Sequence, residues 1–405
     1  MTPYQRPAGA AVPSAVRRTV AMLATSQALA MTGMSLTVTV AALAGEHLAP
    51  DPRLATVPLA LQATASTLAT VPAALLMRRI GRRAGFLSGQ GVGATGAALA
   101  TLALCRGSFV LLALGSALMG VHNAFWQYYR FAAAETASDA FRSRAISLVL
   151  AGGVVAALLG PELAKRGRDL IDAAPFAGSY AIVGLLCLIA VVVLTRLHLA
   201  PPPPAQRRGG RPLAVIASQP RFWVAVTAAA MGYAVMVLLM TATPLAMRAH
   251  HHPFSDTAFV VQWHVLAMFA PSFFTGGLIR RFGVVPILTA GLALNLACVG
   301  INLSGQTLNQ FWLALFLLGV GWNFLFIGGT TLLTETYRPE EGTKVQALND
   351  FIVFGLVTVA TFSSGVLQST LGWRAINLAV LAPLGLCLFA VVWLQTRPRP
   401  AVDPG

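Results

Sequence analysis

The sequence predicts an all-α membrane protein with twelve transmembrane helices in two pseudo-symmetric six-helix bundles. Three observations support this fold class: an apolar composition, apolar stretches of span length, and an internal repeat. Of the 405 residues, 56% are hydrophobic and 10% are charged, and the mean hydropathy is +0.72. Soluble domains contain about 25% charged residues, so this composition excludes an ordinary soluble protein.

Twelve apolar stretches follow one another along the chain. Crossing the hydrocarbon core of a bilayer requires about 20 residues of helix, and each stretch is long enough. They are 17–43, 54–77, 84–104, 109–134, 143–164, 175–196, 220–246, 255–278, 284–304, 308–333, 345–368 and 372–395.

The sequence predicts a cytoplasmic linker at residues 197–219, between an N-terminal bundle, 1–196, and a C-terminal bundle, 220–405. Four consecutive prolines, Pro201–Pro204, and the basic run from Arg207 to Arg211 are incompatible with one continuous helix. Such a composition favours an extended, charged spacer. The other connections are short, as expected for neighbouring antiparallel helices.

The two halves of the chain contain two versions of one segment, residues 120–144 and 319–344. Such a duplication in an apolar chain is typical of secondary transporters, whose substrate site lies between the halves near the bilayer midplane. Matching side chains stand 200 positions apart: Asn123 and Asn323, Glu135 and Glu335, Thr136 and Thr336, Arg144 and Lys344.

The net charge of +15 follows membrane topology. If both termini are cytoplasmic, 20 Lys and Arg residues fall on the cytoplasmic side and seven on the other. Positively charged loops stay inside, so this asymmetry predicts a multi-pass protein of the cytoplasmic (inner) membrane with both termini in the cytoplasm. Nucleic acid is therefore not an expected partner, whereas contact with anionic membrane lipids is. The first span is too long for a cleavable signal sequence and is expected to be retained.

Two loops carry a motif that indicates a family. The run Arg78–Arg83 is similar to the signature G-x-x-x-D-R-x-G-R-R, and Gly276–Gly283 repeats it, with Arg78 and Arg280 at the position of the usual Asp. The whole chain thereby resembles the major facilitator superfamily. The resemblance implies alternating access, with gating by charged residues at the cytoplasmic span ends. The matching gating residues are Arg79, Arg83, Glu135, Arg144, Arg281, Glu335 and Lys344.

The fourth span has the densest group of polar side chains. Asn123, Gln127 and Arg130 follow i, i+4, i+7 spacing, and His122 and Trp126 lie beside them. Polar groups in a bilayer are unfavourable, so this face is a candidate wall of a substrate cavity. Arg130 has two open interpretations: it binds an anionic or carbonyl group, or it reaches the cytoplasmic interface or pairs with a carboxylate.

Further substrate-binding candidates lie in the first span and in the second half. A pseudo-twofold axis would bring Asn123 and Asn323 face to face near the centre. The alternative is hydrogen bonding between helices, worth around 0.6 kcal/mol for each amide. The tryptophans either stack on a planar substrate or pack against other aromatic residues. These further candidates are Gln27, Tyr233, Gln262, Trp263, His264, Trp322 and Asn323.

Three residues are candidates for proton coupling: His264, His122 and Asp350. His264 lies roughly 15 Å deep at 1.5 Å per residue, and histidine changes charge near neutral pH. A neutral histidine with satisfied hydrogen bonds is the alternative. For Asp350, the alternative is a salt bridge with an arginine of the 2–3 loop.

Metal binding and catalysis are not expected. His250, His251 and His252 with Asp256 resemble a metal-capture tract, but consecutive residues of a helix cannot face one ion, so a solvated loop is favoured. The four cysteines show no metal spacing. The chain has no P-loop, no H-E-x-x-H and no nucleophile motif in a supporting context, so neither an enzyme nor a cofactor is expected.

The leading functional hypothesis is a monomeric, proton-coupled secondary transporter of a small organic solute that is polar or anionic, with an aromatic solute as one option. Its expected partners are that substrate, protons and membrane lipids. The sequence leaves two alternatives open: a carrier of a metal ion or a siderophore-like metal chelate, and a membrane receptor that does not translocate its ligand.

Overall fold

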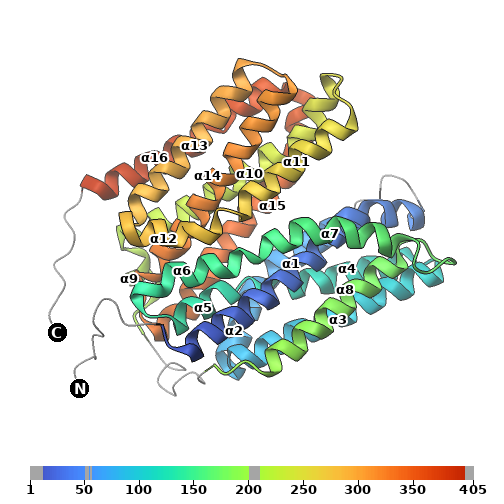
Figure 1. The fold of residues 1–405 in the computed structure, drawn as a ribbon, viewed down its shortest axis with the longest axis horizontal. Helices are drawn as coiled ribbons and strands as arrows, with labels where there is room; N and C mark the ends of the chain where they lie inside the picture. Colours follow the sequence, from blue (N-terminus) through green and yellow to red (C-terminus); the bar gives the residue numbers. More distant parts are fainter. Residues whose placement is uncertain (1–11, 51–53, 55–56, 200–209, 397–405) are drawn as a thin grey trace. The chain divides into compact units, whose positions relative to one another are not determined.

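The computed structural model describes residues 12–50, 54, 57–199 and 210–396, and these residues form α-helices, one 3₁₀ helix and no strand (Figure 1). The predicted all-α fold class is confirmed. The chain divides into two compact units, Met1–Arg208 with Ser272–Gly276, and Gly209–Pro271 with Gly277–Gly405. Part of the predicted linker, 200–209, lies outside the described residues, and the short helix α9, Leu213–Ala217, occupies part of the remainder.

The helices of the first sequence half are α1 Ser14–Leu48, α2 Val57–Ile80, α3 Arg82–Arg106, α4 Phe109–Trp126, α5 Tyr129–Thr136, α6 Asp139–Leu150, α7 Gly152–Arg168 and α8 Ala177–Thr195. Those after α9 are α10 Pro220–Ala249, α11 Phe254–Phe269, α12 Ser272–Phe282, α13 Val284–Ser304, α14 Leu308–Thr334, the 3₁₀ helix η3 Pro339–Glu341, α15 Gly342–Ala379 and α16 Leu381–Thr396.

Nine helical segments of the described chain are long and apolar enough to cross a membrane, or ten if the bent pair α11 and α12 is one span. That pair bends by 42° at Pro271, where proline removes a helix hydrogen bond. The other two long helices, α1 with 35 residues and α3 with 25, also exceed the required length.

Besides the bent pair α11 and α12, four predicted spans differ from single helices. The fourth is broken after α4, at Gln127 and Tyr128, and the fifth is broken at Ala151. The eleventh and twelfth are joined as α15, in which Gly372 has a φ of 76°. This left-handed conformation suits glycine and ends the regular helix where the sequence predicts the boundary between the two spans.

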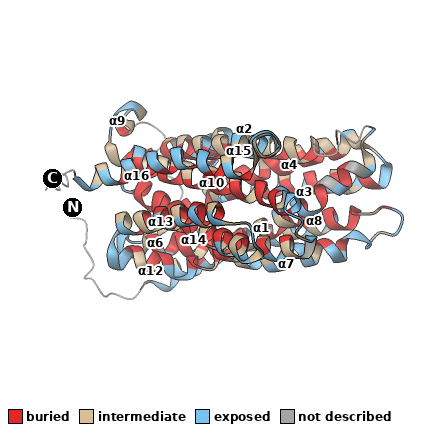
Figure 2. Cartoon of the chain, turned by 90° about the horizontal axis from the view of Figure 1, so that it is seen from above, coloured by how far each residue is buried: buried red, intermediate tan, exposed pale blue. Residues whose placement is uncertain are grey.

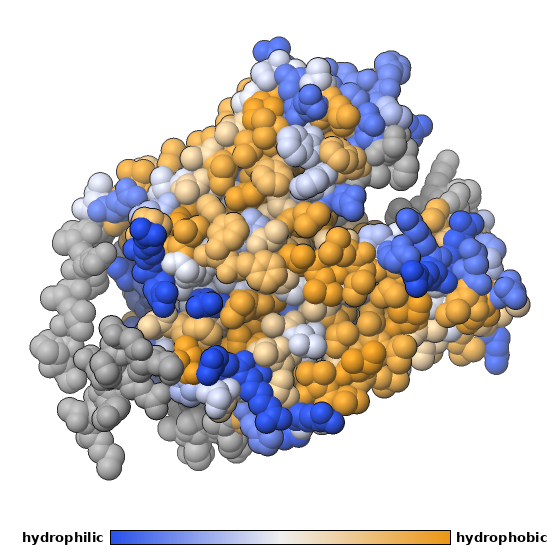
Figure 3. Space-filling model, in the orientation of Figure 1, coloured by the Kyte–Doolittle hydropathy of each residue, from blue (hydrophilic) through white to orange (hydrophobic). Residues whose placement is uncertain are grey.

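Helices pack through small residues, as expected where apolar lipid provides no hydrophobic drive for association. In the first unit, a Cβ atom on Gly120 of α4 would lie 2.1 Å from the backbone oxygen of Gln62 on α2. In each unit buried residues lie mainly on helix faces that meet other helices (Figure 2). On each unit, hydrophobic residues cover most of the visible surface between the helix ends, and hydrophilic residues gather near the helix ends (Figure 3), as a membrane-embedded surface requires.

Candidate functional site

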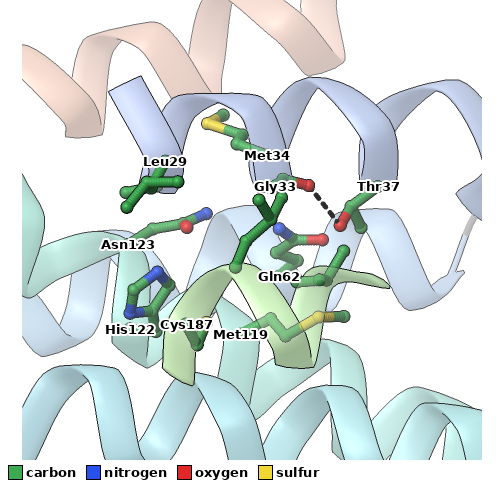
Figure 4. Close-up of a pocket in the computed structure, with 12 residues that line it drawn as sticks. Leu29, Gly33, Met34, Thr37, Gln62, Met119, His122, Asn123 and Cys187 are labelled. Atoms are coloured by element: carbon green, nitrogen blue, oxygen red, sulfur yellow. Dashed lines mark hydrogen bonds between the residues drawn. The ribbon is translucent and has the colours of Figure 1, made fainter. Parts of the chain in front are cut away.

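Residues of helices α1, α2, α4 and α8 of the first unit line a small pocket, here called the first-unit pocket (Figure 4). Its polar side chains are Thr37 of α1, Gln62 of α2, and His122 and Asn123 of α4. Its apolar lining includes Leu29, Met34, Met119, Val183 and Leu186. An apolar wall with a few converging polar groups is typical of a small-molecule site.

Two predicted substrate residues, His122 and Asn123, lie in this pocket and are each 5% exposed. The Oδ1 atom of Asn123 accepts a hydrogen bond from Nε1 of Trp126 at 3.1 Å, one helical turn away. The Nδ1 atom of His122 is 3.1 Å from the carbonyl oxygen of Gly89 on α3. Because a carbonyl only accepts, Nδ1 is the donor, and the neutral ring keeps Nε2 as an acceptor.

Gln62 was not predicted. It lies in the pocket, is 4% exposed, and its Oε1 atom has no hydrogen-bond partner among the described residues. Gln27 is also buried and its Oε1 atom is equally unpartnered within the described chain, but it is not a lining residue of the pocket. The signal for Gln62 is a polar side chain within an apolar span, the same signal that selected Asn123.

Arg130 and Gln127 lie next to the break between α4 and α5, so the predicted i, i+4, i+7 stripe is not part of one continuous helix. The Arg130 side chain is buried, and its NH1 atom donates to the backbone oxygen of Gln127 at 3.0 Å and to Oε1 at 3.2 Å. Its guanidinium also lies 4.5 Å from the centre of the Phe131 ring. Neither residue lines the first-unit pocket.

The second unit contains an aromatic cluster, defined by Tyr233, Phe269, Trp322, Phe326 and Phe354. Trp322 stacks on Phe326 with ring centres 5.1 Å apart. Tyr233 meets Trp322 edge-on at 5.2 Å. Such geometries stabilise aromatic packing beyond the burial of area. Two predicted substrate residues, Tyr233 and Trp322, therefore belong to one group.

Asn323 and His264 connect α14 to α11 within the second unit. The Nδ2 atom of Asn323 donates to the backbone oxygen of Met268 at 2.7 Å, and Nδ1 of His264 lies 2.7 Å from the backbone oxygen of Leu315. Both side chains are almost completely buried. The neighbouring Gln262 and Trp263 are exposed, because successive residues of a helix point about 100° apart. Gln262, Trp263 and His264 therefore do not share one face.

Asp350 of α15 is completely buried, and its Oδ1 atom accepts a hydrogen bond from Nδ2 of Asn349 at 2.8 Å. This contact neither supports nor excludes proton coupling by Asp350, so that role stays a prediction.

The predicted gating glutamates form ion pairs with arginines that the sequence had not singled out. Glu135 lies 2.6 Å from Arg82, and Glu335 lies 2.9 Å from Arg221. Lys344 donates to the backbone oxygen of Arg211, and Arg83 donates to that of Thr195. Arg79, Arg144 and Arg281 are exposed. These contacts join helices within each unit.

A third ion pair, between Arg211 and Glu341, connects the residues before α9 to η3. Glu341 is completely buried and lies 2.7 Å from the NH2 atom of Arg211, which also donates to the backbone oxygen of Thr336. These residues lie in the connections before α10 and α15. The hydrogen bond from Arg211 lowers the pKa of the Glu341 carboxyl from its ordinary 4.5 to about 2.

The histidine tract, His250, His251 and His252, lies between α10 and α11. Among the described residues no group of three or more potential ligands could hold a metal ion. His252 lies 3.9 Å from Asp256, and its Nε2 atom is 2.8 Å from the backbone oxygen of Gln306.

Comparison with known proteins assigns the family. The model of the Major Facilitator Superfamily matches residues 23–361 and 265–405. The chain belongs to the Major Facilitator Superfamily. The predicted family is thereby confirmed, and with it a membrane transporter rather than an enzyme.

Curated transporters match nearly the whole chain. A riboflavin transporter, RfnT of Brucella anthropi, is 41% identical over 391 residues, which cover 96% of this chain and 98% of the relative. An uncharacterized superfamily transporter of Bacillus subtilis, YddS, is 27% identical and covers 94% of this chain and 92% of the relative. The human organic anion transporter MFSD10 has the same fold, with a TM-score of 0.76, 13% identity, and coverage of 94% of this chain and 100% of that one.

Proposed function

We propose that this chain carries riboflavin, or a flavin with the same ring system, across the cytoplasmic membrane by alternating access. The observation that carries the proposal is the 41% identity to a riboflavin transporter along 96% of the chain. A flavin combines a planar aromatic ring with polar edges and a polyol chain. Buried amides of the kind that bind polar edges line the first-unit pocket, and the second unit contains an aromatic cluster.

The first-unit pocket favours a neutral solute over an anion. Its twelve lining residues include no arginine, lysine or carboxylate, and its polar side chains are two amides, a hydroxyl and an imidazole. Placing a phosphate among them would remove its charge from water without a counter-charge, which is strongly unfavourable. Riboflavin itself is therefore the preferred substrate, and its phosphorylated form is expected to be a poor one.

Proton coupling is part of the proposal, with His264 as the first candidate. Its Nδ1 atom forms a hydrogen bond with the backbone oxygen of Leu315. Its Nε2 atom has no hydrogen-bond partner among the described residues, so Nε2 can accept a proton. A reconstituted His264→Gln variant should still exchange riboflavin across the membrane but should not concentrate it in response to a pH gradient. Concentration equal to wild type would exclude His264.

Both termini are proposed to be cytoplasmic, on the basis of 20 positive residues against seven. Reporter fusions at each terminus test this orientation, and activity of a periplasmic reporter at either end would contradict it.

Counterflow in proteoliposomes tests the function without assuming import or export. Purified protein is reconstituted into vesicles preloaded with unlabelled riboflavin, and labelled riboflavin is added outside. A transient accumulation that empty vesicles lack is expected, and the phosphorylated flavin added in excess should compete weakly. Absence of exchange above the empty-vesicle level would overturn the proposal.

A further inference from the structure

The first-unit pocket holds a carboxamide whose oxygen finds no partner in the protein. Gln62 of α2 is 4% exposed, and its Oε1 atom has no hydrogen bond with any described residue. Its side chain and that of Asn123 extend into the same space between α1 and α4 (Figure 4). A buried polar group without a partner has lost its hydrogen bonds to water, so the arrangement is unfavourable until a ligand supplies a partner.

Backbone contact fixes the position of the helical turn that carries this amide. Gly120 of α4 has no side chain, and a Cβ atom there would lie 2.1 Å from the backbone oxygen of Gln62. The two helices therefore touch at Gln62 itself. Asn123 follows Gly120 by three residues and lies on the same side of α4. A polar pair held by helix backbones is preorganised, which reduces the ordering required when a ligand binds.

The hydrogen bonds already made define what each amide can still do. The Oδ1 atom of Asn123 accepts from Trp126, which leaves its Nδ2 atom as a donor to a ligand. The amide of Gln62 can both accept and donate. One acceptor and flanking donors are complementary to an imide, in which an N–H group stands between two carbonyl oxygens.

The isoalloxazine ring of riboflavin has one such edge, its pyrimidinedione. This inference rests on the proposed function. We propose that Gln62 recognises this edge by hydrogen bonding: its amide oxygen accepts a hydrogen bond from the imide N–H, and Asn123 donates one to a neighbouring imide carbonyl. Leu29, Met34 and Met119 provide apolar contact for the ring.

Binding of riboflavin and of 3-methylriboflavin, which lacks the imide N–H, tests this assignment. Purified full-length protein in lipid nanodiscs is titrated by the quenching of flavin fluorescence, with wild type, Gln62→Met and Gln90→Met in parallel. Methionine keeps the shape of glutamine without its polar groups. Gln90 is the matched control, because it is a buried amide of the same unit that donates to Tyr129 and does not line the pocket.

Wild type should bind riboflavin about tenfold more tightly than 3-methylriboflavin, as expected for one buried hydrogen bond. Gln62→Met should bind both ligands with the weaker affinity, and Gln90→Met should keep the tenfold preference. Thermal unfolding adds an independent readout: removing an unsatisfied amide should leave the melting temperature unchanged or raise it, whereas a structural amide would lower it.

Two results overturn the inference, and they are distinguishable. If wild type binds riboflavin but Gln62→Met keeps the preference for the imide N–H, then Gln62 does not read that edge, although the proposed function stands. If wild type binds neither flavin, the proposed function fails, and this assignment fails with it.

Discussion

Position 122 and position 322 are equivalent in the repeat, and they differ in the ring that they carry. In the first unit, His122 lies beside a pocket with an unengaged amide oxygen on Gln62. In the second, Trp322 is the centre of an aromatic cluster. The adjacent asparagines differ in the same way. Asn123 accepts a hydrogen bond from Trp126 of its own helix, whereas Asn323 donates one from α14 to the backbone of α11. The repeat has the same positions in both units, and we propose that the first unit uses them for binding whereas the second uses them for packing.

The largest effect is expected where glycine allows helices to touch. Gly120→Ala places a methyl group against the Gln62 backbone, which cannot move as a flexible side chain would, so we expect a loss of about 3 kcal/mol in stability. Gly319→Ala, on α14, meets the backbone oxygen of His264 at 2.7 Å and should cost less. Thermal unfolding in nanodiscs measures both.

Gly91→Ala is the matched control for these glycines, because no atom lies within 4 Å of its added Cβ. It should be neutral or stabilising by about 0.5–1 kcal/mol. Equal destabilisation by all three substitutions would contradict the close backbone contact at Gly120.

The next effect concerns the Arg211–Glu341 pair of the second unit. Arg211→Ala leaves a completely buried carboxylate without its partner, so we expect a loss of about 2 kcal/mol, at the lower end because the Arg211 side chain is 33% exposed. Folding lowers the Glu341 pKa, so this stability is present above pH 4.5 and is lost as the pH falls towards about 2.

The free energy of unfolding, measured from pH 6 to pH 2.5, tests whether stability falls on acidification. Wild type should lose stability on acidification more steeply than Arg211→Ala, which has already lost the pair. Parallel pH curves would show that Glu341 does not depend on Arg211.

A smaller effect separates the two asparagines. Asn323→Ala leaves the Met268 carbonyl without this donor and should cost about 1 kcal/mol, because a hydrogen bond between helices is lost. Asn123→Ala should change stability less and should lower riboflavin binding more. Melting temperatures and fluorescence titrations of the two variants test this crossed pattern, and a larger binding loss in Asn323→Ala would reverse the assignment of the two units.

The smallest effect on stability is expected at the exposed ion pairs. Glu135→Gln and Glu335→Gln remove pairs with Arg82 and Arg221 and should cost about 0.2–1 kcal/mol each. If these residues gate the transporter, counterflow rates should change while riboflavin binding stays within twofold of wild type. Unchanged counterflow rates in both variants would show that Glu135 and Glu335 are not gating residues.

The sequence predicted the spans, the repeat and the family, because composition and periodicity depend on local residue patterns. It also placed His122 and Asn123 in a polar region, which the pocket contains. It missed Gln62 because this residue has no neighbouring polar side chains of the kind that drew attention to the fourth span. It could not predict the break at Gln127 or the pairing of Glu135 with Arg82, because tertiary contacts decide both.

A structure of the protein with bound riboflavin, determined by electron cryomicroscopy, tests most directly whether the first unit recognises the ligand and the second packs around the conserved positions of the repeat. The account predicts density for the pyrimidinedione edge within hydrogen-bond distance of Gln62 and Asn123, with Asn323 still bonded to Met268. Density that contacts Asn323 and leaves the first-unit pocket empty would contradict it.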